Sequence, residues 1–148
     1  MRISYTLASL PYEYGVLEPH FHESTMKIHH TKHHQIYVIN TNDALKNFPE
    51  LAKLDIEDLI QNLDKGLVDK RTFLRNNAGG HANHSMFWNG LKTGTKLKGK
   101  LKSAIERDFA SVENFKEIFE KAVATRFGSG WAWVSIEIGW KAGSCFDS

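Results

Sequence analysis

Two stretches of this chain concentrate the residue types from which a metal site can be built. The first, Ile28–Tyr37, contains four histidines and ends in a tyrosine, and the second, Asn76–Trp88, contains two more histidines beside a pair of glycines. Neutral imidazole is the commonest metal ligand in proteins. The chemistry open to both stretches is therefore metal coordination, together with proton transfer through imidazole and phenol groups.

In the first stretch, His29, His33 and Tyr37 follow one another at four-residue intervals, so a helix would place them on one side. Spacing alone leaves three interpretations open. A histidine-rich helix face is most often a solvated or hydrogen-bonded structural surface. The pair His29 and His33 can instead chelate one ion. Alternatively, one of them is the ligand and the other relays protons to Tyr37.

In the second stretch, adjacent glycines mark the wall of a site. Gly79 and Gly80 lie inside a segment that otherwise predicts a helix, where each glycine costs about 1 kcal/mol relative to alanine. Such a pair is expected where another backbone or a bulky group approaches closely. Gly80, His84 and Trp88 follow at four-residue intervals, so imidazole and aromatic groups line one helix face beside that space.

The elements that must position these residues are two long helices. We expect the first from Ser24 or Thr25, as its cap, to about Leu45, and the second over about 70–89. Two such helices can pair antiparallel. Metal sites between facing helices are built from ligands that project inward from each of them.

The later part of the chain predicts two further helices and a strand. Leu101, Ile105 and Phe109 mark an amphipathic helix, and Ser111 is placed to cap the next one. The alternation that begins at Trp131 predicts a strand. The residues after 138 have no strong period, and one strand cannot form a sheet. We therefore expect that strand to be isolated and this portion to be structurally incomplete.

Length and composition indicate an ordinary globular chain. Its 148 residues are 41% hydrophobic and 24% charged, with a net charge of +2 that is too small to argue for a nucleic-acid partner. No apolar run approaches the roughly 18 residues of a membrane span. A single cysteine fits a reducing compartment. We expect a cytoplasmic protein with no nucleic-acid or membrane partner.

Four blocks of sequence, in order along the chain, match one known family. They are LEPHF at 17–21, IHHTKHH at 28–34, RNNAGGHANHS at 75–85 and RFGSGW at 126–131. Together they resemble the iron/manganese superoxide dismutase family, and most closely its bacterial manganese branch. The resemblance implies a mainly α fold. A long N-terminal α-helical hairpin over 1–90 is followed, over 95–148, by the start of an α/β domain whose antiparallel sheet has three strands in the full family.

The resemblance also implies an activity and a metal. Members of the family convert superoxide to dioxygen and hydrogen peroxide at one manganese or iron ion. The resemblance to the full-length family also implies a homodimer. We expect manganese here, with iron as the second choice, because the Gly79–Gly80 pair is the pattern of manganese-type members. By the same comparison, His81 is not a ligand.

Five residues of this chain match functional positions of the family. The resemblance implies that His29 and His84 are metal ligands, one from each long helix. It implies that His33 and Tyr37 form a gateway pair at the mouth of the substrate channel. Trp131 matches an aromatic residue that lines the active site.

The chain departs from the family pattern near its C-terminal end. Family members supply an aspartate and a third histidine ligand from a segment of the type Asp-x-Trp-Glu-His-Ala-Tyr. No histidine follows His84 here, Asp147 lacks that context, and the resemblance fades from about Ser135. We therefore expect a C-terminally truncated or frameshifted chain that is poorly active as written. The alternative function is an inactive remnant that binds metal weakly or acts as a helical interaction module.

Overall fold

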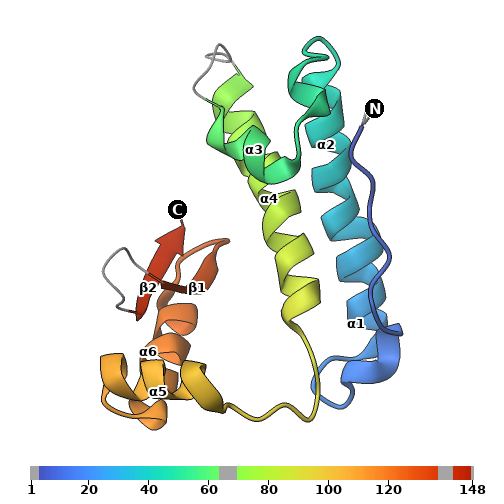
Figure 1. The fold of residues 1–148 in the computed structure, drawn as a ribbon. Coiled ribbons are helices and arrows are strands. Elements are labelled where there is room, and N and C mark those ends of the chain that lie inside the picture. Colours follow the sequence, from blue (N-terminus) through green and yellow to red (C-terminus); the bar gives the residue numbers. More distant parts are fainter. Residues whose placement is uncertain (1–3, 64–69, 137–141, 148) are drawn as a thin grey trace. The chain divides into compact units, whose positions relative to one another are not determined.

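The chain forms two compact units. The described part of the first is helical, and the second combines two helices with a short sheet. The computed structural model describes residues 4–63, 70–136 and 142–147. The units are Met1–Gly94 and Thr95–Ser148, and Figure 1 shows the elements of each. Within the described ranges, no helix is both long enough and apolar enough to cross a membrane.

The first unit is a hairpin of two long helical segments (Figure 1). The first segment runs through α1 (Glu23–Ile28), a π-helical stretch η2 (His29–His34) and α2 (Gln35–Leu45), and the second is α4 (Arg71–Gly90). The remaining elements of this unit are short: the 3-10 turns η1 (Tyr14–Leu17) and η3 (Leu51–Lys53), and the helix α3 (Ile56–Gln61).

Both long helices lie close to the predicted positions, but the predicted cap is wrong. The first helix begins at Glu23, and His22 occupies its N-cap without a side-chain hydrogen bond. Ser24 and Thr25 therefore lie inside the first turn. Glu23 in that turn is favourably placed for the helix dipole, and it also pairs with Lys27 one turn later. The helix is thus stabilised by charge where a hydroxyl cap was expected.

Two clusters of buried side chains hold the hairpin together. The larger cluster joins the N-terminal arm, α2, α3 and α4, and the smaller one joins Leu17, Met26 and Trp88 at the other end. The larger cluster consists of Tyr5, Val38, Ala44, Leu45, Ala52, Ile56, Leu59, Leu63, Leu74 and Ala78. A polar contact also joins α2 to α4, where Asn40 Nδ2 donates to Asn77 Oδ1 at 2.9 Å.

The second unit consists of α5 (Gly99–Phe109), α6 (Val112–Thr125), β1 (Trp131–Ile136) and β2 (Ala142–Asp147). The predicted cap of α6 is confirmed, because the Ser111 hydroxyl accepts a hydrogen bond of 3.0 Å from the backbone N–H of Asn114. Ile105 of α5 and Ala122 of α6 are buried.

The expectation of an isolated strand is wrong. β1 pairs with β2 in an antiparallel two-stranded sheet, with Trp131 opposite Asp147 and Ile136 opposite Ala142. Strand pairing uses backbone N–H and C=O groups, which every non-proline residue carries. A segment without hydrophobic alternation can therefore still pair, and side-chain periodicity was the wrong criterion for β2.

Candidate metal centre

The two predicted metal ligands meet across the hairpin. His29 lies in η2 and His84 lies within α4, 55 residues away in the sequence. Their Nε2 atoms are 3.0 Å apart, and the rings meet edge to face with centroids separated by 5.0 Å. The antiparallel pairing of the two long helical segments is what brings these nitrogens together.

The backbone orients His84. Its Nδ1 lies 2.7 Å from the carbonyl oxygen of Gly80, one helical turn earlier. A carbonyl oxygen only accepts, so Nδ1 carries the proton and Nε2 presents its lone pair toward His29. Burial lowers the pKa of His84 to about 4, against the raising effect of the Gly80 hydrogen bond. The ring is therefore neutral at pH 7, as a metal ligand must be.

His29 is partly buried and complements His84. Burial, followed by the charge of neighbouring His33, lowers the pKa of His29. Because His84 Nε2 is an acceptor, His29 Nε2 carries the proton that joins the two rings. That proton is the one an incoming ion would displace.

The spacing of these two nitrogens fits one metal ion. Two metal–nitrogen bonds of about 2.1 Å that meet at a right angle separate their nitrogens by about 3.0 Å. The Nε2 atoms of His29 and His84 lie at that separation. Imidazole suits iron, and imidazole combined with carboxylate or water ligands suits manganese. His29 and His84 are therefore the residues that would hold the metal.

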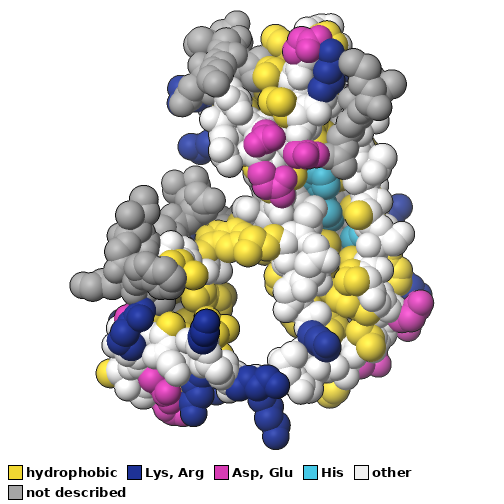
Figure 2. Space-filling view, in the orientation of Figure 1, with side chains coloured by type: hydrophobic (Ala, Val, Ile, Leu, Met, Phe, Trp, Pro, Cys, Tyr) yellow, Lys and Arg dark blue, Asp and Glu magenta, His cyan; other side chains and the backbone are white. Residues whose placement is uncertain are grey.

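His33 is the third member of the group. One potential ligand atom on each of His29, His33 and His84 lies within 4.8 Å of the others. His33 is exposed. A depression of about 440 Å³, lined by Thr25, Ile28, His29 and His33, opens beside it. Histidine side chains reach the surface of the hairpin between its two long helical segments (Figure 2).

Tyr37 packs directly on Gly80. A Cβ atom added to Gly80 would lie 2.6 Å from Cδ1 of the Tyr37 ring, which is closer than real Cβ contacts occur. The Tyr37 ring also contacts His33 and His84, with centroids 5.2 and 5.3 Å apart. The predicted close approach is therefore confirmed at Gly80. It is wrong at Gly79, where an added Cβ would meet nothing within 4 Å.

Both ring nitrogens of His34 make hydrogen bonds within the hairpin. Its Nδ1 accepts a hydrogen bond of 3.1 Å from the Trp88 indole N–H, so its Nε2 carries the proton and donates to His81 Nδ1 at 2.8 Å. Its ring stacks on His84 with centroids 5.2 Å apart. Burial, with the neighbouring imidazoles, lowers the pKa of His34 to about 3. His34 therefore supports His84 and has no nitrogen left for an ion.

Both ring nitrogens of His30 also make hydrogen bonds within the hairpin unit. Its Nε2 donates to the backbone oxygen of Ala8 at 2.9 Å, and its Nδ1 accepts from the Tyr14 hydroxyl at 2.9 Å. Both ring nitrogens are used, and the ring is buried. His30 holds the N-terminal arm against the first long helical segment.

Four of the five predicted site residues come together: His29, His33, Tyr37 and His84. Trp131 lies on β1 in the second unit, where its ring contacts that of Trp133 with centroids 5.9 Å apart. Its role in the site stays a prediction.

Sequence reasoning missed the groups that orient the ligands. The Gly80 carbonyl fixes the tautomer of His84, and His34 supports the same ring from the other helical segment. Phe87 also contacts the His29 ring, with centroids 6.2 Å apart. The four-residue interval from Gly80 to His84 was a usable signal for the first contact. No local signal predicts the second, since it depends on how the hairpin closes.

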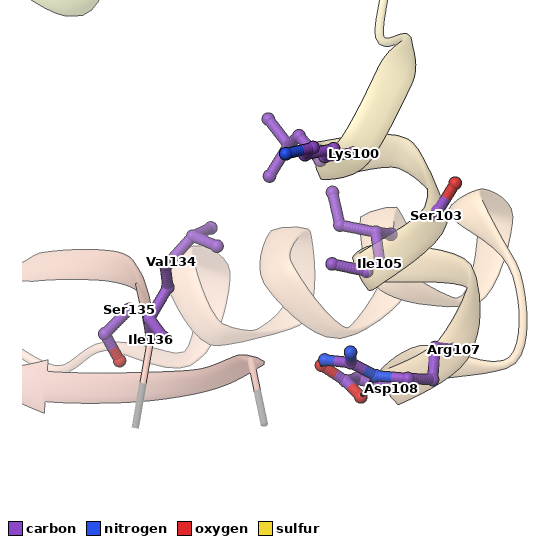
Figure 3. Close-up of a pocket in the computed structure, with 10 residues that line it drawn as sticks. Lys100, Ser103, Ile105, Arg107, Asp108, Val134, Ser135 and Ile136 are labelled. Atoms are coloured by element: carbon purple, nitrogen blue, oxygen red, sulfur yellow. Dashed lines mark hydrogen bonds and ion pairs between the residues drawn. The ribbon is translucent and has the colours of Figure 1, made fainter. Parts of the chain in front are cut away.

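The second unit holds a cavity of a different kind. It has a volume of about 720 Å³ and lies between α5 and β1, where Ile105 faces Val134 and Ile136 (Figure 3). Arg107 and Asp108 form an ion pair at its side, with Arg107 Nε 2.6 Å from Asp108 Oδ1. Its walls are mostly apolar side chains, and none of its lining residues is a histidine or cysteine. The candidate metal centre therefore lies in the hairpin.

Two family models match this chain. The model described as the alpha-hairpin domain of iron/manganese superoxide dismutases matches residues 4–92. The model described as the C-terminal domain of the same family matches residues 97–142. The two matches follow one another along the chain.

Curated relatives agree with these matches. The chain is 67% identical over 135 residues to a manganese superoxide dismutase of Yersinia enterocolitica, and 66% identical over 135 residues to one of Escherichia coli K12. It is 54% identical over 132 residues to one of Buchnera aphidicola. These alignments cover 91%, 91% and 89% of this chain but 65%, 66% and 64% of the relatives. The chain thus spans slightly less than two thirds of their length.

Proposed function

Since this chain belongs to the iron/manganese superoxide dismutase family, we propose that it supplies the hairpin half of a metal site that dismutates superoxide. Two superoxide anions and two protons yield one dioxygen and one hydrogen peroxide. Manganese is the proposed metal, with iron as the second choice, because the relatives cited above are named manganese enzymes.

One observation carries the proposal: the Nε2 atoms of His29 and His84 face each other at 3.0 Å from two different helical segments. The Gly80 carbonyl holds His84 in the tautomer that binds metal. His30 and His34, which are adjacent to the ligand and to the gateway residue in sequence, have both nitrogens bonded to protein groups. The hairpin therefore offers one defined pair of donors rather than a loose group of histidines.

A metal held by His29 and His84 would supply the one-electron redox chemistry that dismutation needs. The protein must also deliver protons for hydrogen peroxide. His33 and Tyr37 are suited to this, because an exposed imidazole contacts a partly buried phenol that in turn contacts His84. We assign these two residues to a proton and substrate path between solvent and the metal.

The remaining assignments rest on the family. Trp131 is proposed to line the active site and exclude water from it. The proposed assembly is a homodimer in the cytoplasm. The single cysteine of the chain is compatible with a reducing compartment.

The test is to load the chain with manganese and, separately, with iron, and to measure bound metal by elemental analysis and superoxide consumption per bound ion. The same measurements are made on a version extended by the C-terminal segment of a manganese relative. We expect His29→Ala and His84→Ala each to abolish defined metal binding, and dismutation with it. His22→Ala is the matched control, because His22 is exposed and lies at the start of the same helical segment.

Dismutation that survives in His29→Ala or His84→Ala would contradict the ligand assignment. Because the original chain is expected to be poorly active, metal binding without dismutation in the extended chain as well would contradict the proposed activity and leave a metal-binding module. Equal loss of metal in His22→Ala would show that the ion is held by the histidine-rich surface in general.

A further inference from the structure

We propose that His29, His33 and His84 form a three-imidazole site for nitrogen-preferring divalent cations of the Zn²⁺, Co²⁺ and Cu²⁺ class, with His33 as the third ligand. The proposal rests on the proposed function in one respect, since it uses the same ligand pair His29 and His84. It differs in the role of His33, which the proposed function assigns to the proton and substrate path rather than to the metal.

The three potential donors lie close together. Ligand atoms of His29, His33 and His84 lie within 4.8 Å of one another. The ring of His33 is 5.1 Å from that of His29 and 5.1 Å from that of His84, measured between centroids. His29 and His84 are already close enough to bind one ion, so His33 is the only member that has to move.

His33 can make this movement at little cost. It is exposed, whereas His84 is buried and His29 partly buried. The depression lined by His29 and His33 leaves room beside the ring. Rotation of an exposed side chain does not disturb the packed core. His29 and His33 also lie four residues apart in one helical segment, an interval at which two side chains can reach the same ion.

The donor set determines which ions this site selects. Three imidazoles with one position open to solvent are a common arrangement for Zn²⁺. Affinity for nitrogen donors rises from Mn²⁺ through Co²⁺ to Cu²⁺, and Zn²⁺ also exceeds Mn²⁺. A third imidazole therefore adds more affinity for Co²⁺ or Zn²⁺ than for Mn²⁺. These ions would compete with manganese for the hairpin.

The test is a titration of the metal-free full chain with Co²⁺, followed by visible absorption, and a parallel titration with Mn²⁺, followed by the electron paramagnetic resonance of the free ion. We expect one Co²⁺ per chain with the intense absorption of a four-coordinate complex. His33→Ala should weaken Co²⁺ binding by at least about tenfold, the lower end of what removal of a supporting group costs. It should also reduce the absorption intensity, and it should leave Mn²⁺ affinity unchanged.

Three comparisons make the result decisive. His33→Gln checks that the effect follows the lost imidazole rather than the lost volume, and His22→Ala should bind Co²⁺ like the original chain. If His33→Ala keeps the Co²⁺ affinity and spectrum while His29→Ala loses them, His33 is not a ligand and the His29–His84 pair stands. If the original chain binds no Co²⁺, both the three-imidazole site and the proposed ligand pair fail.

Discussion

At the scale of single residues, hydrogen-bond partners decide which imidazoles can bind a metal ion. His30 and His34 each have a partner on both ring nitrogens, and in both rings a carbonyl acceptor or an indole donor fixes which nitrogen holds the proton. The Nδ1 of His84 donates to the Gly80 carbonyl, and its Nε2 faces His29 Nε2 at 3.0 Å rather than a backbone or indole group. Its Nε2 therefore remains available to an ion that displaces the proton of His29. Histidines that are neighbours in sequence thus have different chemistry.

The glycine pair allows a matched test of close packing. Gly80→Ala places a Cβ atom against the Tyr37 ring, whereas Gly79→Ala meets nothing within 4 Å. We expect Gly79→Ala to raise the free energy of unfolding by up to about 1 kcal/mol, because alanine favours the helix. Gly80→Ala should lower it, since overpacking costs about 1–3 kcal/mol and exceeds that gain. Urea unfolding of both variants measures the difference; equal effects would mean that Tyr37 moves away freely.

The buried histidines predict how stability depends on pH. Burial lowers the pKa of His34 to about 3 and that of His84 to about 4, from an ordinary value of 6.5. Between pH 6.5 and about 4 the unfolded chain therefore binds protons that the folded chain excludes. Stability of the metal-free chain should be complete above pH 6.5 and fall below it, by about 1 kcal/mol per pH unit for each histidine.

Chemical denaturation at a series of pH values measures that slope. His34→Gln removes one of the two groups, so its stability should fall less steeply with pH, even if its stability at pH 7 is lower. An unchanged slope in His34→Gln would show that His34 is already protonated in the folded chain.

At the scale of elements, helix ends in this chain are stabilised in two ways. α6 begins with a side-chain cap, in which the Ser111 hydroxyl accepts from the Asn114 backbone N–H. The N-cap residue of the first long helix makes no side-chain hydrogen bond; the Glu18 carboxylate accepts from the Glu23 backbone N–H at 3.1 Å, and Glu23 itself lies in the first turn. A capping hydroxyl satisfies a specific backbone donor, whereas a carboxylate acts through charge over the whole turn.

The cap of α6 can be tested against a second serine in the same unit. Ser111→Ala should destabilise the second unit by about 1 kcal/mol, because a backbone donor loses its partner. Ser103→Ala should have no destabilising effect, since Ser103 is exposed inside α5, where alanine is a better helix former. Thermal unfolding followed by circular dichroism compares them. A loss in Ser103→Ala as large as that in Ser111→Ala would argue against the cap as the cause.

At the scale of the whole molecule, the chain is organised as two units joined by a lysine-rich segment. The unit boundary lies between Gly94 and Thr95. Lys92, Lys96 and Lys98 are exposed and lie between the end of α4 and the start of α5. Exposed segments outside regular structure are preferred sites of proteolytic cleavage.

Limited trypsin digestion should therefore cleave at Lys92, Lys96 or Lys98 before it cleaves inside α4, α5 or α6. Mass spectrometry of the early fragments identifies the first site. Replacing the three lysines by glutamine should slow the appearance of these fragments while leaving the later ones unchanged. Early cleavage inside α4 would instead show that the hairpin opens before the segment between the units is cut.

The sequence alone determined the two long helices, the strand at Trp131, the helix cap at Ser111 and the family. These features depend on neighbours within a few residues or on blocks of sequence that can be compared directly. The tertiary structure decided the rest. The Tyr37 ring packs against Gly80 but not against Gly79, and β1 pairs with β2.

The tertiary structure also decided which histidine nitrogens remain available to an ion. Trp88, which donates to His34, and Gly80, which accepts from His84, act only once the hairpin has closed around them. Spacing along a helix specifies which side chains lie on the same face, but not which groups of other elements that face contacts. Hydrogen bonds and packing join residues about 50 positions apart here, and no local pattern in the sequence records which atoms will touch.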